Sequence, residues 1–192
     1  PRGHKNGCRS HHRDHLSAMG HTSSISVALT AKEDTTQDIG IASYAITDSA
    51  VVANFSAGSG LNQANYVWAD RRTLLASASE VINMSAPVPQ DALGQVLNLL
   101  KIKALYIFNY GGATAAPADI IKVGGEGSSD CWNSIFDGSD TAKLSLQPGG
   151  ALVLTAPSAA GYAVTNPGNY KLKIENTNGA QAVDYKIIVI GA

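Results

Sequence analysis

Residues 99–110 read LLKIKALYIFNY and carry the clearest secondary-structure signal in the chain. Their side chains fall into two alternating sets, which is the period of two of a β-strand whose faces meet different surroundings. Gly111 and Gly112 follow and are expected to end this strand. The first set is Ile102, Ala104, Tyr106 and Phe108, and the second is Lys103, Leu105, Ile107 and Asn109.

Similar short apolar segments flank this strand on both sides. They predict strands near residues 24–29, 39–46, 120–123, 144–146, 151–154, 162–164, 170–175 and 183–190. Gln147-Pro-Gly-Gly150 predicts a type II turn, because proline fixes φ at the second position and glycine accepts a positive φ at the third. Asn176-Thr-Asn-Gly179 predicts a hairpin turn between the last two strands.

Two segments depart from the strand pattern. Residues 49–60 are rich in Ser, Ala, Gly and Asn and predict a loop. Residues 90–100 space their apolar side chains by three and four and predict one helix. The whole pattern predicts an all-β fold, an antiparallel β-sandwich or jelly roll over residues 61–192. An extended basic N-terminal arm and linker, with one or two strands, is predicted over residues 1–60.

Charge is unevenly distributed along the 192 residues. Residues 1–18 contain four Lys or Arg and one Asp, whereas the whole chain has a net charge of −1, so the body is acidic. Two interpretations of the basic segment stay open: a leader with no part in the fold, or an arm that orders against a partner. Nucleic acid is a disfavoured partner because the bulk charge gives no electrostatic case for it. No membrane partner is expected, because the chain has no apolar run of about 18 residues.

Charged residues are sparse as well as uneven. They make up 15% of the chain, against roughly 25% in a typical soluble domain. Residues 49–69, 104–118 and 144–170 contain none. Uncharged stretches favour surfaces that meet other subunits, because an isolated domain usually carries Lys or Glu there for solubility. The alternative is that Ser, Thr, Asn and Gly supply a neutral polar surface.

The sequence offers little for catalysis or metal binding. No histidine lies between Thr22 and Ala192 and no Gly-x-Ser-x-Gly motif is present, so the body lacks the usual base and nucleophile of a serine hydrolase. Cys8 lies near three histidines, but their compressed spacing and cationic neighbours argue against zinc. Cys8 and Cys131 are expected to be free thiols. We therefore predict no enzymatic activity, no catalytic residue, no cofactor and no metal.

Seven segments follow one another in residues 62–192, at residues 66–75, 78–83, 102–109, 146–154, 161–164, 170–176 and 183–191. Their order resembles small β-sandwich structural proteins of tailed-bacteriophage virions, which decorate the head or build collar and tail parts. The resemblance implies homo-oligomers held by extended arms and strand edges, without catalytic residues. It does not extend to residues 1–20.

These observations lead to a prediction of a non-enzymatic virion protein, a capsid decoration protein that binds the shell and its own copies. Its expected partners are the major capsid protein or other virion proteins, and its expected location is the phage head surface or the adjacent collar and tail. One alternative is a collar, tail or fibre component. Another is a carbohydrate-binding module for host attachment that uses Trp68, Trp132 or a tyrosine such as Tyr106 or Tyr162. The interface candidates are Arg2, Arg9, Arg13, Phe55, Tyr66 and Trp68.

Overall fold

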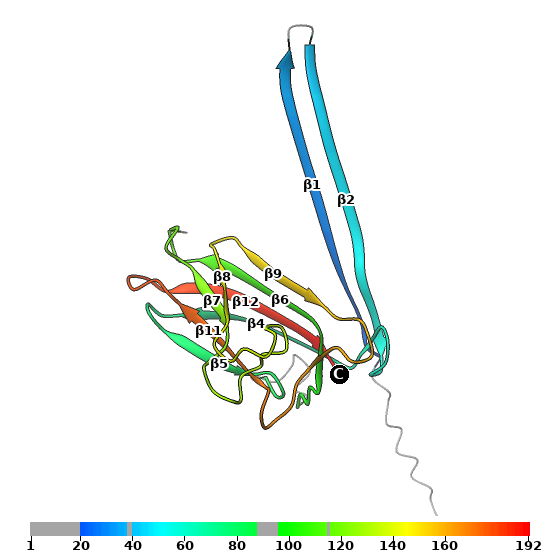
Figure 1. The fold of residues 1–192 in the computed structure, drawn as a ribbon, viewed down its shortest axis with the longest axis vertical. Coiled ribbons are helices and arrows are strands. Elements are labelled where there is room, and N and C mark those ends of the chain that lie inside the picture. The colour runs from blue at the N-terminus through cyan, green and yellow to red at the C-terminus, as the bar shows by residue number, and fades with distance from the viewer. Residues whose placement is uncertain (1–19, 38–39, 88–95, 115) are drawn as a thin grey trace, which may run out of the picture.

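The computed structural model describes residues 20–37, 40–87, 96–114 and 116–192, and these residues form strands, turns and loops without a helix. A compact body of short strands carries one long hairpin that projects from it (Figure 1). The strands are β1 Thr22–Gln37, β2 Gly40–Ala57, β3 Gln63–Ala64, β4 Tyr66–Leu74, β5 Ser79–Asn83, β6 Lys101–Gly111, β7 Ile121–Gly124, β8 Lys143–Leu146, β9 Ala151–Thr155, β10 Tyr162–Ala163, β11 Lys171–Asn176 and β12 Val183–Gly191.

The body is an eight-stranded jelly roll. One sheet has the order β4-β12-β6-β9, with the short β10 also paired to β6, and the other has the order β5-β11-β7-β8. Every pairing within these two sheets is antiparallel. Apart from β7 and β8, consecutive strands of the eight lie in different sheets, which is the double-sheet arrangement of a jelly roll. The predicted all-β sandwich is therefore confirmed.

The main core lies between the two sheets and is built by alternation along their strands. Trp68 of β4, Ile107 of β6 and Ile174 of β11 point inward and are buried in one continuous cluster. Trp132, in the loop between β7 and β8, is also fully buried, and its indole N–H donates to the carbonyl oxygen of Ala163 at 2.9 Å. Burial of that polar group is thus compensated by a hydrogen bond.

A β-bulge in β6 changes one predicted orientation. Gly191 of β12 pairs with Ile102 and Ile190 pairs with Ala104, so Lys103 is the extra residue. Because an inserted residue reverses the alternation beyond it, Ile102 lies in the main core and not on the face of Ala104. The Lys103 side chain is fully buried, and its ammonium donates to the carbonyl oxygens of Gly60, at 3.1 Å, and Ser158.

The two predicted turns have opposite outcomes. At residues 147–150, Gly149 has a φ of 76° and the Gly150 N–H donates to the Gln147 carbonyl oxygen at 2.8 Å, which confirms the turn. The hairpin predicted at 176–179 is wrong, because the strands on its two sides belong to different sheets. This segment crosses between the sheets, and the buried Asn176 amide donates to the carbonyl oxygens of Leu74, Leu75 and Gln181.

The helix predicted over residues 90–100 is absent from its described part, residues 96–100. Leu97 and Leu99 are buried, whereas Val96 and Leu100 are exposed. This alternation has a period of two, so the segment inserts every second side chain into the core. Residues 88–95 lie outside the described residues.

The hairpin of β1 and β2 replaces much of the predicted arm and linker. Thr22 pairs with Ser56 at its root and Gln37 pairs with Gly40 at its far end. The loop predicted over 49–60 is therefore wrong over residues 49–57, which continue β2 up to Ala57. The short β3 pairs in parallel with the end of β2, which joins the hairpin root to the body. Residues 1–19, with the basic segment, lie outside the described residues.

Candidate interaction surface

The two outer faces of the sandwich differ in chemistry. The outer face of the β5-β11-β7-β8 sheet carries Lys171, Lys173 and Glu175 on β11 and Lys122 on β7. The carboxylate of Glu175 binds the ammonium groups of Lys143 and Lys173, each at 2.7 Å. The hydrogen bonds from Lys143 and then Lys173 hold the pKa of Glu175 below its ordinary value. Such a face is well suited to contact with water.

The outer face of the β4-β12-β6-β9 sheet is mainly apolar and aromatic, and we call it the apolar face. Its side chains alternate with those that enter the main core, so they point away from the opposite sheet. Val153 is 37% exposed and belongs to β9 at the edge of this face. Members of the apolar face are Val67 and Ala69 of β4, Ala104, Tyr106, Phe108 and Tyr110 of β6, Ala151 and Val153 of β9, and Ile188 and Ile190 of β12.

A row of aromatic rings runs along the centre of the apolar face. The ring centroids of Tyr106 and Phe108 are 6.4 Å apart, and those of Phe108 and Tyr110 are 4.7 Å apart in an edge-to-face arrangement. A cation lies over each end of the row. The ammonium of Lys186 is 5.4 Å from the Tyr106 ring, and the guanidinium of Arg71 is 4.5 Å from the Tyr110 ring. These contacts hold the rings in place.

Arg71 also belongs to a polar corner of this surface. Its guanidinium donates to Asp184 at 3.0 Å, and the Thr73 hydroxyl donates to the same carboxylate at 2.6 Å. The hydrogen bond from Thr73, followed by that from Arg71, keeps the pKa of Asp184 below its ordinary value. A hollow of about 490 Å³ lies here, between Arg71 and Tyr110 on one side and Gln181 and Asp184 on the other.

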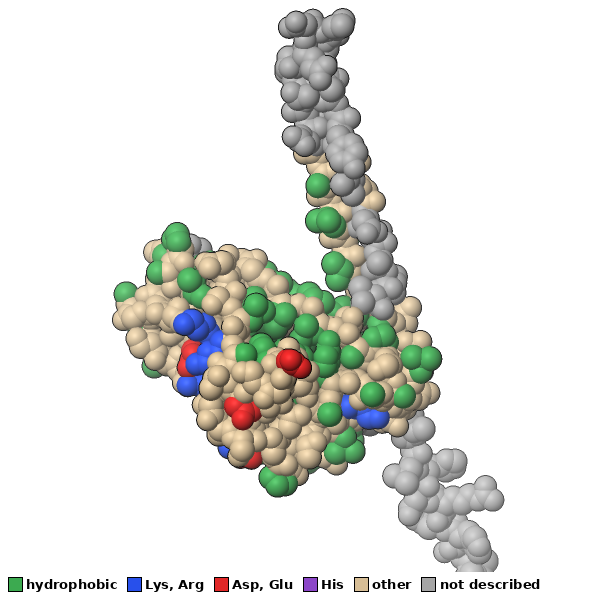
Figure 2. Space-filling model, in the orientation of Figure 1, with side chains coloured by type: hydrophobic (Ala, Val, Ile, Leu, Met, Phe, Trp, Pro, Cys, Tyr) green, Lys and Arg blue, Asp and Glu red, His purple; other side chains and the backbone are tan. Residues whose placement is uncertain are grey.

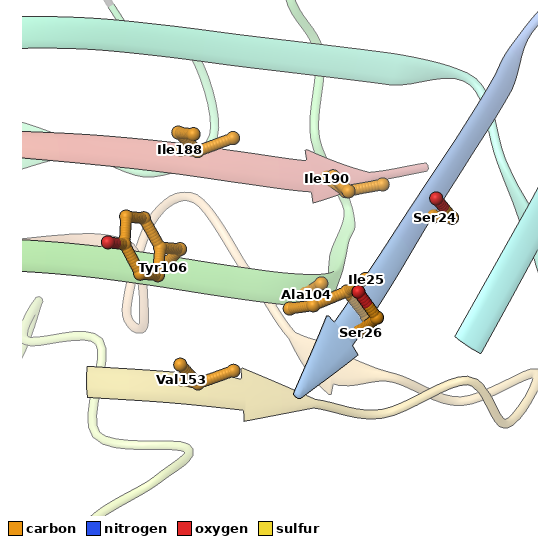
Figure 3. A pocket seen from close by; sticks show the side chains of 8 residues that line it. All are labelled: Ser24, Ile25, Ser26, Ala104, Tyr106, Val153, Ile188 and Ile190. Atoms are coloured by element: carbon orange, nitrogen blue, oxygen red, sulfur yellow. The ribbon is translucent and has the colours of Figure 1, made fainter. Parts of the chain in front are cut away.

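A second hollow lies where the hairpin leaves the body (Figure 3). It has a volume of about 320 Å³. Ser24, Ile25 and Ser26 of β1 form one wall, and the end of the apolar face forms the other. In Figure 3 the Ile25 side chain reaches toward Ala104. The residues of the second wall are Ala104, Tyr106, Val153, Ile188 and Ile190.

The hairpin root has a small core of its own. Phe55 and Ala53 of β2 are buried with Ala104 and Ile190 of the apolar face, and Ile25 packs against this cluster half-buried. Beyond the root, the same side of β1 continues with Val27, which is 46% exposed, and Leu29, which is 63% exposed. The hairpin therefore starts as a docked element and becomes an exposed one with apolar side chains.

The predicted interface residues separate into three groups. Phe55 and Trp68 are 2% and 1% exposed, so both side chains are buried within this chain. Tyr66 is half-buried and packs against the main core. Arg2, Arg9 and Arg13 lie outside the described residues. Trp68 is buried because it occupies an inward position of β4, and the Arg72 guanidinium lies 5.5 Å from its ring.

The residues that do form the surface were partly visible in the sequence. Tyr106 and Phe108 belong to the same alternating set of side chains in residues 99–110. The uncharged stretch 104–118 contains most of β6, and the uncharged stretch 144–170 contains β9. Sequence reasoning missed Ile188 of β12 as a surface residue. The signal in the sequence is that the uncharged part of β6, from Ala104 onward, pairs with the uncharged strand β9 in one sheet.

The described residues hold another charged cluster, at the β4–β5 edge. Arg72 pairs with Glu80 and with Asp70, at 2.9 Å from the latter, and the Tyr185 hydroxyl donates to Glu80 at 2.6 Å. Burial, followed by the hydrogen bond to Glu80, raises the pKa of Tyr185, so its hydroxyl stays protonated. The guanidinium binds both carboxylates, and the cluster joins neighbouring strands of the two sheets. We interpret it as a structural ion-pair network.

Cys131 is a free thiol and is fully buried. Burial raises its pKa, so the reactive thiolate form is disfavoured. Within the described ranges, no three His, Cys, Asp or Glu side chains are grouped so that they could hold a metal ion. The same ranges contain no helix of the length and apolarity needed to cross a membrane.

Comparison with known proteins adds no relative. No protein-family profile matches the chain, and no curated protein matches it. Function must therefore be argued from the surface described above, which combines a projecting hairpin with an apolar sheet face.

Proposed function

We propose that this protein is a non-enzymatic structural component of a tailed-bacteriophage virion, and specifically a capsid decoration protein that binds the shell and its own copies. One observation supports this proposal above the others. A jelly roll with one charged outer face and one apolar outer face carries a long hairpin whose exposed side chains include Val27 and Leu29. Exposed apolar surface of this extent is typical of a protein that binds other subunits.

The mechanism is mechanical and not chemical. The jelly roll is a rigid base, and β1, with 16 residues, extends about 50 Å at roughly 3.4 Å per residue. A hairpin of that length contacts a neighbouring subunit at a distance from the jelly roll of its own chain. Each Val or Leu side chain that becomes fully buried there stabilises the assembly by about 1.5–3 kcal/mol. Several such contacts per subunit raise the free energy needed to separate subunits of a shell.

The space-filling view is consistent with an apolar binding region that is separate from the charged groups. Hydrophobic side chains gather on the body next to the base of the hairpin, while Lys, Arg, Asp and Glu lie in separate groups (Figure 2). In the proposal, the apolar region binds protein subunits. The basic segment, with Arg2, Arg9 and Arg13, adds a salt-sensitive attraction to an acidic shell surface.

Mass spectrometry of intact particles tests this proposal. The phage that encodes this chain is purified, and the copy number of the chain is measured against that of the major capsid protein. A copy number comparable with the capsid protein supports decoration of the head. A few copies per particle support the collar, tail or fibre alternative. Absence from purified particles contradicts a virion role.

A second candidate function is carbohydrate binding during host attachment. Trp68 and Trp132 are buried and unavailable for stacking on a sugar. The aromatic row, however, ends at Tyr110 beside the hollow that contains Arg71 and Asp184, and aromatic rings next to fixed polar groups are typical of ligand sites. Titration of tyrosine fluorescence with a glycan panel tests it. Binding that is lost in Tyr110→Ala and retained in Tyr162→Ala supports this candidate, and an unchanged signal with every glycan contradicts it.

A further inference from the structure

We propose that the β1–β2 hairpin of one copy lies across the apolar face of a second copy, and that the exchange is reciprocal in a two-fold dimer. This inference rests on the self-association included in the proposed function. It names the two surfaces that meet, which are the exposed side of β1 and the apolar face of the β4-β12-β6-β9 sheet.

The first step is that the hairpin already binds this face within its own chain. At the root, Phe55 and Ile25 pack against Ala104 and Ile190, which are the last residues of the apolar face on β6 and β12. The side chains of the hairpin and of the face are therefore complementary where they touch. The hairpin of a second copy would make the same type of apolar contact further along this face.

The second step is that both surfaces continue past this contact and remain uncovered. Beyond Ile25, β1 presents Val27 and Leu29. Beyond Ala104, the face presents Tyr106 and Val153 along the wall of the hollow at the root. The hairpin projects away from the body (Figure 1), and Val27, Leu29 and Val153 are all partly exposed, so apolar side chains of both surfaces meet water. A two-stranded ribbon of this kind is marginally stable without a partner.

The third step is that, beyond its root, the hairpin of a given copy is held away from its own face (Figure 1). Its root is joined to β3, and the Ser56 N–H donates to the Asn62 carbonyl oxygen at 3.1 Å. Two lysines of β6 reinforce this position. Lys101 donates to the carbonyl oxygens of Ser59 and Ala159. Lys103 donates to the carbonyl oxygens of Gly60 and Ser158, which lie in the same two loops. Folding back onto its own face would break these bonds, whereas a second copy can use that face without breaking them.

The dimensions suit a dimer. A hairpin about 10 Å wide that overlaps a face over roughly 25 Å covers on the order of 250 Å² on each surface. Two hairpins and two faces then bury about 1,000 Å² in total, which reaches the size of a specific interface. The same patches are used by both copies, as a two-fold interface requires.

Charge also favours this pairing. Residues 22–57 contain four acidic residues and one lysine. The apolar face is flanked by Lys186 over Tyr106 and by Arg71, whose side chain is 62% exposed and binds Asp184, the acidic residue on the same face. An acidic ribbon and a face with excess cations attract each other, and this attraction aligns the two copies.

Cross-linking between two variants that each carry one exposed cysteine tests the geometry; Cys131 stays in both variants but is fully buried. Both are made in a Cys8→Ser background, one with Leu29→Cys on the hairpin and the other with Val153→Cys on the face. They are mixed with a bis-maleimide whose span tolerates a small offset in register. The matched control replaces Val153→Cys by Leu144→Cys, because Leu144 is 41% exposed and lies on the opposite sheet. We expect the hairpin–face pair to form a covalent dimer at least about tenfold faster than the control pair. Equal rates, or no dimer from either pair, would overturn the inference.

A second measurement uses sedimentation of full-length variants. Val27→Asp with Leu29→Asp is expected to weaken self-association at least about tenfold, because the reciprocal dimer would bury two introduced charges from each copy. The control is Val81→Asp with Leu144→Asp, which places the same two charges on the opposite sheet at similarly exposed positions and should leave association unchanged. Dimers that survive the hairpin variant overturn the inference and leave the virion role intact. Dimers that require the hairpin, in a protein absent from virions, support the inference and contradict the virion role.

Discussion

Replacing Phe55 by alanine should detach the hairpin root while leaving the jelly roll folded. Phe55 is 2% exposed and belongs to the small root cluster, which is separate from the main core. Removing a buried phenylalanine costs about 3–5 kcal/mol, and we expect the lower end because the cluster is small and most of its other buried members are alanines. A loss of about 3 kcal/mol corresponds to an increase of roughly 100-fold in the population of the detached state.

Hydrogen exchange measured by mass spectrometry on dilute, monomeric protein checks this value. Amides near the root, in residues 53–57 and 63–65, should exchange about 100-fold faster, because local opening governs their exchange. Amides of residues 183–188 of β12, in the centre of its sheet and outside the root cluster, should keep their wild-type rates. Phe136→Ala is the control, since it makes the same chemical change in a half-buried loop residue outside the root cluster. The reasoning is refuted if β12 loses protection in parallel with the root, or if Phe136→Ala has the same effect on residues 53–57.

Two further predictions concern the loops at the ends of the sheets. Asp119 is buried and accepts hydrogen bonds from the N–H groups of Gly112 and Ala116 and from the side chains of Asn178 and Gln181. Burial acts to raise its pKa, but these hydrogen bonds outweigh it and lower the pKa below the ordinary 3.8. Ionised Asp119 therefore stabilises the folded state fully above that value, and this stabilisation is lost as pH falls through the lower folded-state pKa. In urea unfolding between pH 2 and 6, the unfolding free energy of Asp119→Asn should depend less on acid than that of the wild type. Parallel curves for the two proteins would contradict this. Among the turn glycines, an added Cβ at Gly149 meets nothing within 4 Å, so its positive φ alone sets the cost of substitution. Gly149→Ala should therefore lower the unfolding free energy by about 1–2 kcal/mol. Gly125→Ala should cost more in the same urea assay, because its Cβ would lie 1.9 Å from the Asp140 carbonyl oxygen, and equal losses would show that the loop relaxes.

Local patterns in the sequence predicted the strands well. The alternation over residues 99–110 corresponds to β6, and the proline and glycines at 147–150 form the predicted turn between β8 and β9. Both features depend on residues close in sequence, because strand alternation and turn geometry are set by the backbone of a few neighbours. The uncharged composition of residues 104–118 also indicated that the strand would have an outer face without charge.

The errors concern contacts between residues that are distant in sequence. Asn176 and Asn178 resembled hairpin-turn residues, yet they are buried, and their side chains bind groups far away in the chain, such as Leu74 and Asp119. Nothing local distinguishes a turn within one sheet from a crossing between two sheets. The place of Trp68 in the main core also depends on the fold, since alternation along β4 does not say which of its two faces meets the core.

The difference between the two outer faces is the strongest reason to regard this chain as part of an assembly. Hydrophobic burial inside the sandwich explains the inward residues of both sheets, and it makes no demand on the outward ones. If both outer faces met water, both would be expected to resemble that of β11, where Lys173 and Glu175 form ion pairs. On β6 the equivalent outward positions hold Tyr106 and Phe108, which gain nothing from solvent exposure. A partner that covers this face gives those aromatic side chains a physical role, and the hairpin carries exposed apolar residues that match it.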